Sequence, residues 1–370
     1  MMYDIFKLHT TFVNKLKKVA VYVYKKYGAK KSWNQRHNTV FNNHPDYRLK
    51  CDTEIEKKHK KLWSPFNSHF SPNTLRVCKN ISGKCNTEIV PEEIFQVDIE
   101  PSLNRYCLAD FFEHKSFYNK WHKGNIFPED YLHSINGKLL NSELDVIDLK
   151  EAKNISEKLK YPVVLKANFE TYGGKNINFI NTSEELINYI TNIEDFVVQE
   201  KMSQHELLAK FHRRSLNTVR ACLYRSVTDN KVYFLHAALR MGRNGSLDNV
   251  SAGGLVSFIN EKGRMHGYAL NKYGEKFFKH PNTKMTFTDK LPAYEELKSL
   301  SIEIMRHIFY ARVVGLDLCF DSDGNWRVIE VNINSNTIRF AQYAGEPFFK
   351  EFTSEVIKYC KHKHWILSQT

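Results

Sequence analysis

VGLDLCFDSDGNWRVIEVNIN, residues 314–334, is the most informative segment of the chain. Two apolar runs flank Asp323-Gly324, a residue pair that strongly favours a tight β-hairpin turn. If these two residues form the turn, Asp317 lies directly opposite Glu330. Because side chains alternate along a strand, Asp317, Glu330 and Asn332 then share one face of the hairpin. The opposite, core-facing side is expected to carry Leu316, Leu318, Phe320, Ile329 and Val331.

Two carboxylates directly opposed on a sheet repel each other, so their face needs a compensating partner. Mg²⁺ is one such partner, because it prefers oxygen ligands and usually takes one or two carboxylates together with water and substrate phosphates. Asn332, two residues after Glu330, adds a neutral oxygen on the same face. The alternative is an exposed hairpin whose polar face meets water, since such alternation is common on half-buried sheets.

Three upstream segments carry groups that suit an anionic ligand. Lys166 ends the apolar run of residues 162–165, where a lysine needs a partner such as a phosphate. Gly173 and Gly174 allow the backbone to approach phosphate oxygens closely, although a Gly-Gly pair also marks ordinary hairpin turns. Residues 197–202, VVQEKM, indicate a strand that runs into a linker, whose exposed backbone could pair with a purine. Each signal is ambiguous alone, and their order along the chain is more informative.

That order resembles the ATP-grasp superfamily, and more closely the sugar-transfer-associated ATP-grasp family found with polysaccharide-biosynthesis genes. The resemblance is carried by PVVLKANFETYGGKNI, VVQEKMSQHELL, LNTVRACLYR, ALRMGRNGSLDNVSAGG and GLDLCFDSDGNWRVIEVNIN. It extends over residues 112–349 and implies an α+β fold in which two subdomains grip ATP. We expect a basic, largely helical N-terminal region at residues 1–105, a first ATP-grasp subdomain at 106–202, and a second at 203–370 that contains the magnesium-binding hairpin.

The resemblance also implies nucleotide-binding residues. Lys115 matches the first phosphate-binding lysine, but the family often has an acid where His114 stands, so Lys120 is kept as the alternative. Lys166 would contact the α- and β-phosphates. The other positions implied are Gly173 and Gly174 as a lid over the phosphates, Lys175, which equally suits solvent, and Gln199, Glu200, Lys201, Met202, His205 and Glu206 around the adenine and ribose.

A reacting centre is implied farther along the chain. Arg220 would neutralise the γ-phosphate or an acyl-phosphate, and Arg240, Asn249 and Ser251 would line the same centre with Lys166. For each arginine the alternative is a salt bridge on a strand, but Arg220 lies in an apolar strand, where an unpaired charge is costly. The implied metal ligands, for two Mg²⁺ ions, are Asp317, Glu330 and Asn332.

The activity implied by the family is ligation of a carboxylate to an amine, driven by ATP through an acyl-phosphate. Its expected substrates are a small-molecule or glycan carboxylate and an amine, such as a sugar acid and an amino acid in surface polysaccharide or capsule synthesis. A kinase acting on a sugar hydroxyl is the second hypothesis. The third is a non-catalytic module that binds a glycan or a membrane and retains a vestigial ATP site.

The N-terminal region is strongly basic within a chain of 370 residues and net charge +13. This favours a polyanionic glycan or an anionic membrane surface as a partner, and no nucleic acid is expected; a solvated basic helix face is the plain alternative. Apolar residues at three- and four-residue steps predict a helix over residues 3–27, with Gly28 as its stop. Such a helix could lie on a membrane, but we favour its docking on the protein body. Residues 32–46 are expected to form a loop.

Elsewhere the pattern predicts helices over residues 108–122, 148–159 and 294–310 and a shorter one from Ser183. Strands are expected at 163–165, 177–180, 196–198, 219–224 and 232–240. The seven cysteines are scattered without a C-x-x-C pair and indicate reduced thiols. Cys360, His362 and His364 lie among lysines, which favours an exposed helix end over a metal site. Without a recognisable secretory signal, we expect a cytoplasmic protein, with peripheral attachment at the inner membrane face as an open alternative.

Overall fold

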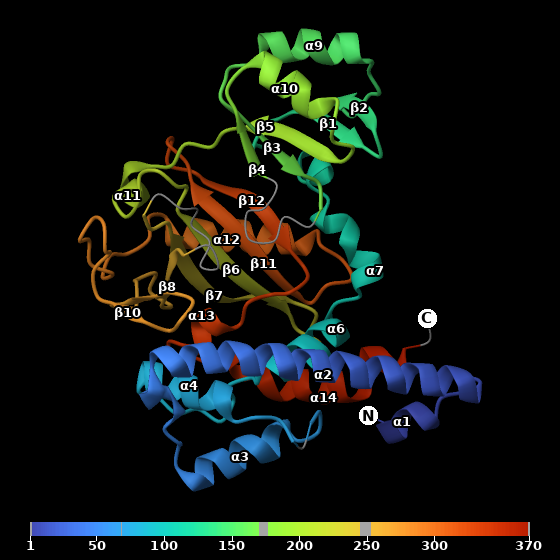
Figure 1. Ribbon diagram of the computed structural model, residues 1–370, viewed down its shortest axis with the longest axis vertical. Coiled ribbons are helices and arrows are strands. Elements are labelled where there is room, and N and C mark those ends of the chain that lie inside the picture. The colour runs from blue at the N-terminus through green and yellow to red at the C-terminus, as the bar shows by residue number, and fades with distance from the viewer. Residues whose placement is uncertain (1, 68, 170–176, 245–252, 369–370) are drawn as a thin grey trace.

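The computed structural model describes residues 2–67, 69–169, 177–244 and 253–368. The structure contains two antiparallel sheets: the first lies at the top of the view in Figure 1 and the second in the middle, with a layer of helices from both ends of the chain beneath the second sheet. This arrangement confirms the predicted α+β class with antiparallel hairpins.

The first sheet contains five strands, all from residues 106–202, in the order β2-β1-β5-β3-β4. Two predicted helices pack on it through Ala152, Leu186 and Ile190. Asp148 caps the first of them by accepting a hydrogen bond from the Glu151 backbone N–H, and Thr182 caps the second in the same way. The elements are β1 (Asp130–Ile135), β2 (Lys138–Asn141), α9 (Leu149–Lys158), β3 (Val163–Ala167), β4 (Ile177–Ile180), α10 (Ser183–Ile190) and β5 (Phe196–Glu200).

The second sheet contains seven strands, all from residues 203–370, in the order β10-β9-β8-β7-β6-β11-β12. Its central strands β6 and β11 are buried along almost their whole length because both faces of the sheet are covered. On one face α12 contacts β6, β7 and β12 and closes the largest core. The elements are α11 (Glu206–Ala209), β6 (Thr218–Arg225), β7 (Val232–Met241), β8 (Leu255–Ile259), β9 (Ala269–Leu270), β10 (Lys276–Phe277), α12 (Tyr294–Arg306), β11 (Val313–Phe320) and β12 (Trp326–Asn332).

The opposite face of the second sheet is covered by segments far apart in the sequence. Cys222 and Tyr224 of β6 share a buried cluster with Trp63, Phe95 and Phe348. The layer of helices from both ends of the chain therefore completes the core of this sheet. Its helices are η1 (Pro45–Arg48), α3 (Thr53–Trp63), α4 (Asn73–Ser82), α5 (Glu92–Ile94), η2 (Phe95–Ile99), α6 (Glu100–Leu103), α13 (Arg339–Gln342), η7 (Lys350–Phe352), α14 (Thr353–His362) and η8 (Trp365–Leu367).

The N-terminal helix differs from the prediction at both ends. α1 (Met2–Phe6) is separate, and α2 (Phe12–Asn43) begins after Thr11, whose side chain accepts a hydrogen bond from the Asn14 backbone N–H. α2 continues through Gly28 and through residues 32–43, which were predicted as loop. A mid-helix glycine costs only about 1 kcal/mol, and the following turns bury Trp33, Val40 and Phe41. None of the described helices combines the length and apolar character that crossing a bilayer requires.

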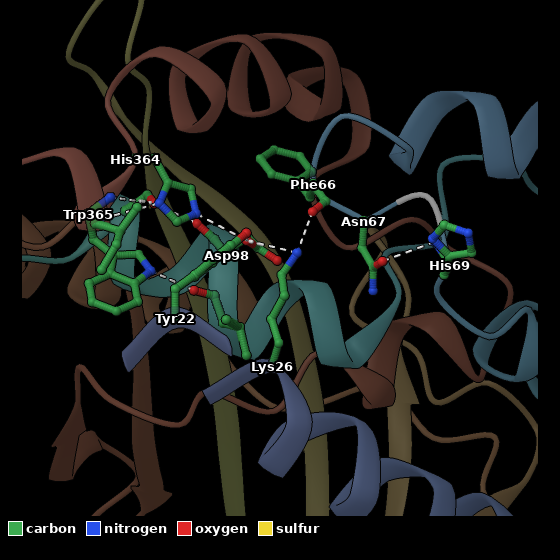
Figure 2. A network of polar contacts seen from close by, with 11 residues as sticks. Tyr22, Lys26, Phe66, Asn67, His69, Asp98, His364 and Trp365 are labelled. Atoms are coloured by element: carbon green, nitrogen blue, oxygen red, sulfur yellow. Dashed lines mark hydrogen bonds and ion pairs between the residues drawn. The ribbon is translucent and has the colours of Figure 1, made fainter. Parts of the chain in front are cut away.

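A buried polar network holds α2 on the body, as the prediction of docking requires (Figure 2). Tyr22 Oη donates to Asp98 Oδ1 at 2.5 Å, His364 Nε2 lies 3.1 Å from the same oxygen, and Lys26 Nζ lies 3.9 Å from it. Burial, together with the charge of Asp98, raises the pKa of Tyr22 well above its usual range. The network joins α2, η2 and the C-terminal segment. It also corrects the prediction of an exposed helix end there, because Cys360 and His364 are buried.

Residues 106–121 form short turns instead of the predicted helix over 108–122. These are α7 (Tyr106–Ala109), η3 (Asp110–Glu113), η4 (Lys115–Phe117) and α8 (Tyr118–Trp121). Glu113 explains one of the interruptions, because its Oε1 accepts hydrogen bonds from the backbone N–H groups of Ile333 and Asn334. The segment packs along the end of β12, and it therefore does not form one regular helix.

Candidate functional site

The β11–β12 hairpin pairs Asp317 with Glu330, as predicted, although its turn is different. Residues 321–325 form a wider loop, in which Asp321 Oδ1 accepts from two backbone N–H groups. The register then shifts between Asp317 and Leu318. This bulge restores the predicted pairing beyond it. It also turns Val328 into the core and Ile329 toward a cavity, so the prediction of Ile329 in the core is wrong.

Asp317 is compensated by two arginines. Its Oδ1 accepts from Arg220 Nε at 2.5 Å, its Oδ2 accepts from Arg220 Nη2 at 3.0 Å, and Arg240 Nη1 lies 3.3 Å from Oδ2. Arg220 reaches Asp317 because the two residues are paired across β6 and β11. Burial alone would raise the pKa of Asp317, but the charges of Arg220 and Arg240 hold it below its ordinary value. The expected repulsion at this face is thus balanced, in part, by cations of the protein itself.

Glu330 is balanced by a lysine from the segment before the first sheet. Lys115 Nζ lies 3.2 Å from Glu330 Oε1, and Lys115 is buried. Lys120, the alternative, instead pairs with Glu143 at 2.5 Å, with its side chain 36% exposed. The geometry therefore favours Lys115 over Lys120 as the lysine of the site.

Lys166 brings the first sheet into the same charge cluster. It lies on β3 opposite Val197 of β5. Burial and the nearby charge of Lys115 lower the pKa of Lys166 to about 8, against a raising effect of Glu330. At this pKa Lys166 is still mainly protonated at neutral pH, and a nearby anion would favour its charged form further. Lys115 and Lys166 thus form a cationic pair where the two sheets meet.

The strand-to-linker segment after β5 is fixed against the tip of the hairpin. Ser322 N donates to Ser203 O at 2.9 Å, and His205 N donates to Phe320 O at 2.9 Å. Glu200 Oε1 accepts from Arg327 Nη2 at 2.9 Å. These bonds tie the predicted adenine-binding segment to β11 and β12.

The side chains of this segment lie in different surroundings. Gln199 is buried and donates to Asp130, whereas Lys201 is exposed, with its Nζ 5.8 Å from the ring of Phe179. His205 Nδ1 accepts from the Leu207 backbone N–H and caps α11. Glu206 forms a surface ion pair with Arg213. Met202 is half-buried.

A cavity of about 820 Å³ opens beside the charge cluster, a size suited to a small-molecule substrate. Six predicted site residues line it: Lys115, Arg220, Arg240, Asp317, Glu330 and Asn332. Lys166 and residues 199–206 are not among its lining residues. The predicted positions Gly173, Gly174, Lys175, Asn249 and Ser251 lie outside the described residues, so their roles stay predictions.

Several lining residues were missed by the sequence analysis. Asn334 and Asn336 continue the polar alternation of Asn332 beyond β12, and the run NINSN at residues 332–336 could have indicated them. Glu100 accepts from Asn336 N at 2.7 Å and from its Nδ2 at 3.0 Å. The contributions of Glu100 and Glu113 could not be seen in advance, because their partners lie more than two hundred residues away.

The residues present fit Mg²⁺ in part. Glu330 has a side chain 28% exposed and lines the cavity with Asn332, whose buried Nδ2 faces Asp317 without reaching hydrogen-bond geometry. Carboxylate and amide oxygens are ligands that suit this ion. The described residues contain no cluster of three or more metal-ligating His, Cys, Asp or Glu, so phosphate oxygens and water would complete the shell.

Comparison with known proteins gives a family match over most of the chain. The model described as sugar-transfer associated ATP-grasp matches residues 95–357. No curated protein matches the chain in sequence.

Solved structures give partial likenesses. The biotin carboxylase domain of 2-oxoglutarate carboxylase from Hydrogenobacter thermophilus, with MgADP, ADP and bicarbonate, is 16% identical at a TM-score of 0.43, covering 70% of this chain and 47% of that one. The ATP-grasp ligase PsnB, in complex with a phosphomimetic variant of its minimal precursor, Mg and ADP, is 12% identical at a TM-score of 0.42. The match covers 70% of this chain and 61% of that one. N5-carboxyaminoimidazole synthetase from Staphylococcus aureus, in complex with ADP, is 13% identical at a TM-score of 0.38. The match covers 68% of this chain and 52% of that one. The chain thus spans about half to three fifths of these structures, and the family match carries the assignment.

Proposed function

The chain belongs to the sugar-transfer associated ATP-grasp family, and on that premise we propose that it is an ATP- and Mg²⁺-dependent ligase that joins a carboxylate to an amine. The observation that carries this proposal is the convergence of Lys115, Arg220 and Arg240 on Asp317 and Glu330 beside the 820 Å³ cavity, with Lys166 close by. Three cations that line a substrate-sized cavity, with a fourth nearby, suit a reaction between two anions.

The chemistry follows from those charges. A carboxylate oxygen attacks the γ-phosphorus of ATP, the bond to the β-phosphate oxygen breaks, and an acyl-phosphate and ADP form. An amine then attacks the acyl carbon, loses a proton and expels phosphate, leaving an amide. Both steps need positioning and positive charge rather than a protein nucleophile.

The residues of the chain have distinct parts in this scheme. Lys115 and Lys166 would neutralise the phosphates, while Asp317 fixes Arg220 and Arg240 side by side for the γ-phosphoryl group. Glu330 and Asn332, with Asp317, would hold Mg²⁺, which when bound supplies further charge neutralisation. Groups fixed in advance need no reorganisation as charge develops.

The proposed carboxylate substrate is a sugar acid, and the proposed amine is an amino acid or a related amine. The family description, which links these proteins to sugar transfer, supports this choice and supports a place in surface polysaccharide synthesis. The polar lining of the cavity, which includes Asn334 and Asn336, also suits a hydroxylated ligand.

A matrix of sugar acids and amino acids, with ADP release and product mass as readouts, tests the proposal. We expect ADP only where an acid is present, an amide where both substrates are present, and a hydroxamate when hydroxylamine replaces the amine. Glu330→Ala should abolish turnover, whereas Glu296→Gln, at an exposed acid on α12, should leave it unchanged. ADP formed without any carboxylate, or a phosphorylated sugar without an amide, would overturn the ligase and favour a kinase.

A further inference from the structure

Polar atoms without a hydrogen-bond partner gather along the walls of the cavity. Among the described residues, fifteen buried side-chain nitrogen and oxygen atoms have no hydrogen-bond partner, and six of them belong to residues that line this one cavity. Such atoms are rare in folded proteins, and a cluster of them points to a ligand or to ordered water. Four of the six have no ion-pair partner either: His37 Nδ1, Asn332 Nδ2, Asn334 Oδ1 and Asn336 Oδ1. The other two, Glu92 Oε1 and Arg339 Nε, lie 3.2 Å apart as an ion pair.

The backbone is shaped to leave Asn336 in the cavity. A Cβ atom at Gly315 would lie 2.5 Å from Asn336 Oδ1 and 3.3 Å from Arg220. Glycine at this position of β11 therefore makes room for an amide that is 7% exposed and whose oxygen has no hydrogen-bond partner in the described part of the chain. With Asn334, it brings amide groups to the cavity that suit the hydroxyl groups of a substrate.

One wall of the cavity comes from α2, which precedes the residues matched by the family model. Trp33, Arg36 and His37 line the wall, and the Arg36 guanidinium lies 4.5 Å from the Trp33 ring centroid. The Arg339 guanidinium lies 5.3 Å from the same ring, and its Nε lies 3.2 Å from Glu92 Oε1. The described residues offer the Arg36 guanidinium no hydrogen bond or salt bridge, so it is the cation of this wall that is open to an anion.

We propose that this α2 wall binds a second anionic group of the substrate, a carboxylate or a phosphate, through Arg36 supported by Arg339. The proposal rests on the proposed function, because it places the reacting carboxylate at the Lys115 end and the remote anion at the α2 end. The substrate class is then a hydroxylated acid with two anionic groups. The amides of Asn334 and Asn336 contact its hydroxyl groups.

Calorimetric titration of two probes, inorganic phosphate and glucuronate, tests this site in protein saturated with Mg²⁺ and AMPPNP, which fills the γ-phosphate position. We expect at least one probe to bind the wild type, and Arg36→Gln to weaken it by at least about tenfold, the effect of losing one charge-assisted contact. Arg36→Lys should bind better than Arg36→Gln. The probe that binds identifies the anion. Lys31→Gln, at an exposed lysine on the same helix that does not line the cavity, should match the wild type.

Equal affinity in the wild type and Arg36→Gln, or no binding of either probe, would overturn the proposal and leave water as the occupant of this wall. Failure of the proposed function would be seen separately. If AMPPNP does not bind, the nucleotide site is refuted, and the phosphate titration is then read in the protein alone.

A different surface of the same helix carries a second inference. The outer side of α2 exposes large apolar residues at positions three, four or eight residues apart, which lie on one side of a helix. Three exposed lysines, Lys17, Lys30 and Lys31, accompany them. Tyr22, Ala29 and Trp33, which dock α2 on the body, are buried. The exposed residues are Phe12 (65%), Val13 (60%), Leu16 (47%), Tyr24 (78%) and Tyr27 (67%).

We infer that this outer face of α2 docks on an anionic lipid surface. Exposed apolar side chains beside lysines are the pattern of helices that lie in a membrane interface, where the rings enter the headgroup region and the lysines meet acidic headgroups. The helix then has two separate roles, one wall in the cavity and one face on lipid.

Vesicle co-sedimentation tests this face. We expect the full chain to bind phosphatidylcholine vesicles that contain about one third phosphatidylglycerol, and to lose binding as salt rises. Leu16→Glu should reduce binding at least tenfold, and Val146→Glu, at an exposed apolar residue elsewhere, should not. Binding that is equal on pure phosphatidylcholine, or equal in Leu16→Glu, would overturn the inference. So would a wild-type dimer that Leu16→Glu dissociates without any vesicle binding, which would assign the face to a second copy of the chain.

Discussion

At the scale of single residues, Asp317 sets the positions of two guanidinium groups, those of Arg220 and Arg240. Its carboxylate is 2% exposed and takes both Nε and Nη2 of Arg220, with Arg240 Nη1 at 3.3 Å. Breaking one partner of such a buried arrangement leaves uncompensated charge in a poorly solvated place. Asp317 thus matters both to stability and to the proposed chemistry.

Asp317→Asn should lower the free energy of unfolding by about 3–5 kcal/mol, because it keeps the shape and removes the charge that pairs with Arg220. It should also lower kcat by about a hundredfold, since the arginines lose their fixed positions. Urea unfolding and ADP release measure the two effects, with Glu296→Gln as the control. A variant with full activity would show that Asp317 does not position the arginines for the reaction.

Lys166 gives a pH dependence with a defined direction. Its pKa in the folded protein is lowered to about 8, so the nucleotide should bind most tightly where the lysine is protonated. Affinity for ADP is expected to fall as pH rises through about 8, measured by calorimetry from pH 7 to 9.5. Lys166→Arg, which stays charged throughout, should flatten the profile. The same fall in both proteins would assign the titration to another group.

The lowered pKa also predicts how stability changes with pH. Unfolded Lys166 keeps its proton up to its ordinary pKa near 10.5, whereas the folded protein releases it from about pH 8. Between these values the unfolded state binds more protons, so Lys166 makes the free energy of unfolding rise with pH. Its destabilising effect is complete below pH 8 and is relieved above it.

The residue predictions from sequence succeeded where local alternation decided the outcome. Asp317, Glu330 and Asn332 were expected on one face, and Asp317 does oppose Glu330. The partners of these groups could not be predicted in the same way. Arg220 lies 97 positions from Asp317 in the chain, and only the order of strands in the second sheet brings them together. The roles in metal and nucleotide binding stay predictions.

At the scale of elements, the hairpin shows how two local deviations compensate. The wider loop at residues 321–325 moves the pairing by one position, and the bulge between Asp317 and Leu318 moves it back. A two-residue turn would have given the same Asp317–Glu330 pair without the bulge. Only the structure shows that Ile329 leaves the core and lines the cavity.

Two glycines within regular elements should respond in opposite ways to alanine. Gly28 lies in the middle of α2, and an added Cβ would meet nothing within 4 Å, so Gly28→Ala should raise the free energy of unfolding by about 0.5–1 kcal/mol. Gly315→Ala should lower it and reduce activity, because its Cβ would press on Asn336 and Arg220. Urea unfolding compares the two. Destabilisation by Gly28→Ala would contradict a continuous α2.

The extent of α2 was mispredicted because Gly28 was read as a helix stop. Local propensity favoured the stop, but tertiary burial of Trp33, Val40 and Phe41 repays the cost of a glycine inside the helix. Elements with strong periodicity and clear caps, such as α9 and α10, were predicted well. The short turns of residues 106–121 depend on contacts with the end of β12 and carried no local signal.

At the scale of the whole molecule, α2 lies outside the residues that the family model matches, yet it forms part of the cavity. It is anchored through Tyr22 to Asp98 and His364 (Figure 2) and forms a wall of the cavity through Trp33 and Arg36. Both ends of the chain therefore meet under the second sheet (Figure 1). Loss of this anchor should therefore lower the free energy of unfolding and also disturb the α2 wall of the cavity.

Tyr22→Phe should lower the free energy of unfolding by about 1–3 kcal/mol, because it removes the hydroxyl that donates to buried Asp98. The control is Tyr27→Phe on the same helix, whose side chain is 67% exposed. Urea unfolding followed by tryptophan fluorescence measures both. Equal stability of the two variants would indicate that the network does not hold α2 in place.

The central claim, activation of a carboxylate by ATP, is tested most directly by oxygen transfer. A sugar acid labelled with ¹⁸O in both carboxylate oxygens is turned over with ATP and an amine, and the released phosphate is analysed by mass. An acyl-phosphate route predicts one ¹⁸O atom in the phosphate and one in the amide. Unlabelled phosphate, with both ¹⁸O atoms retained in the sugar acid or its product, would contradict the account.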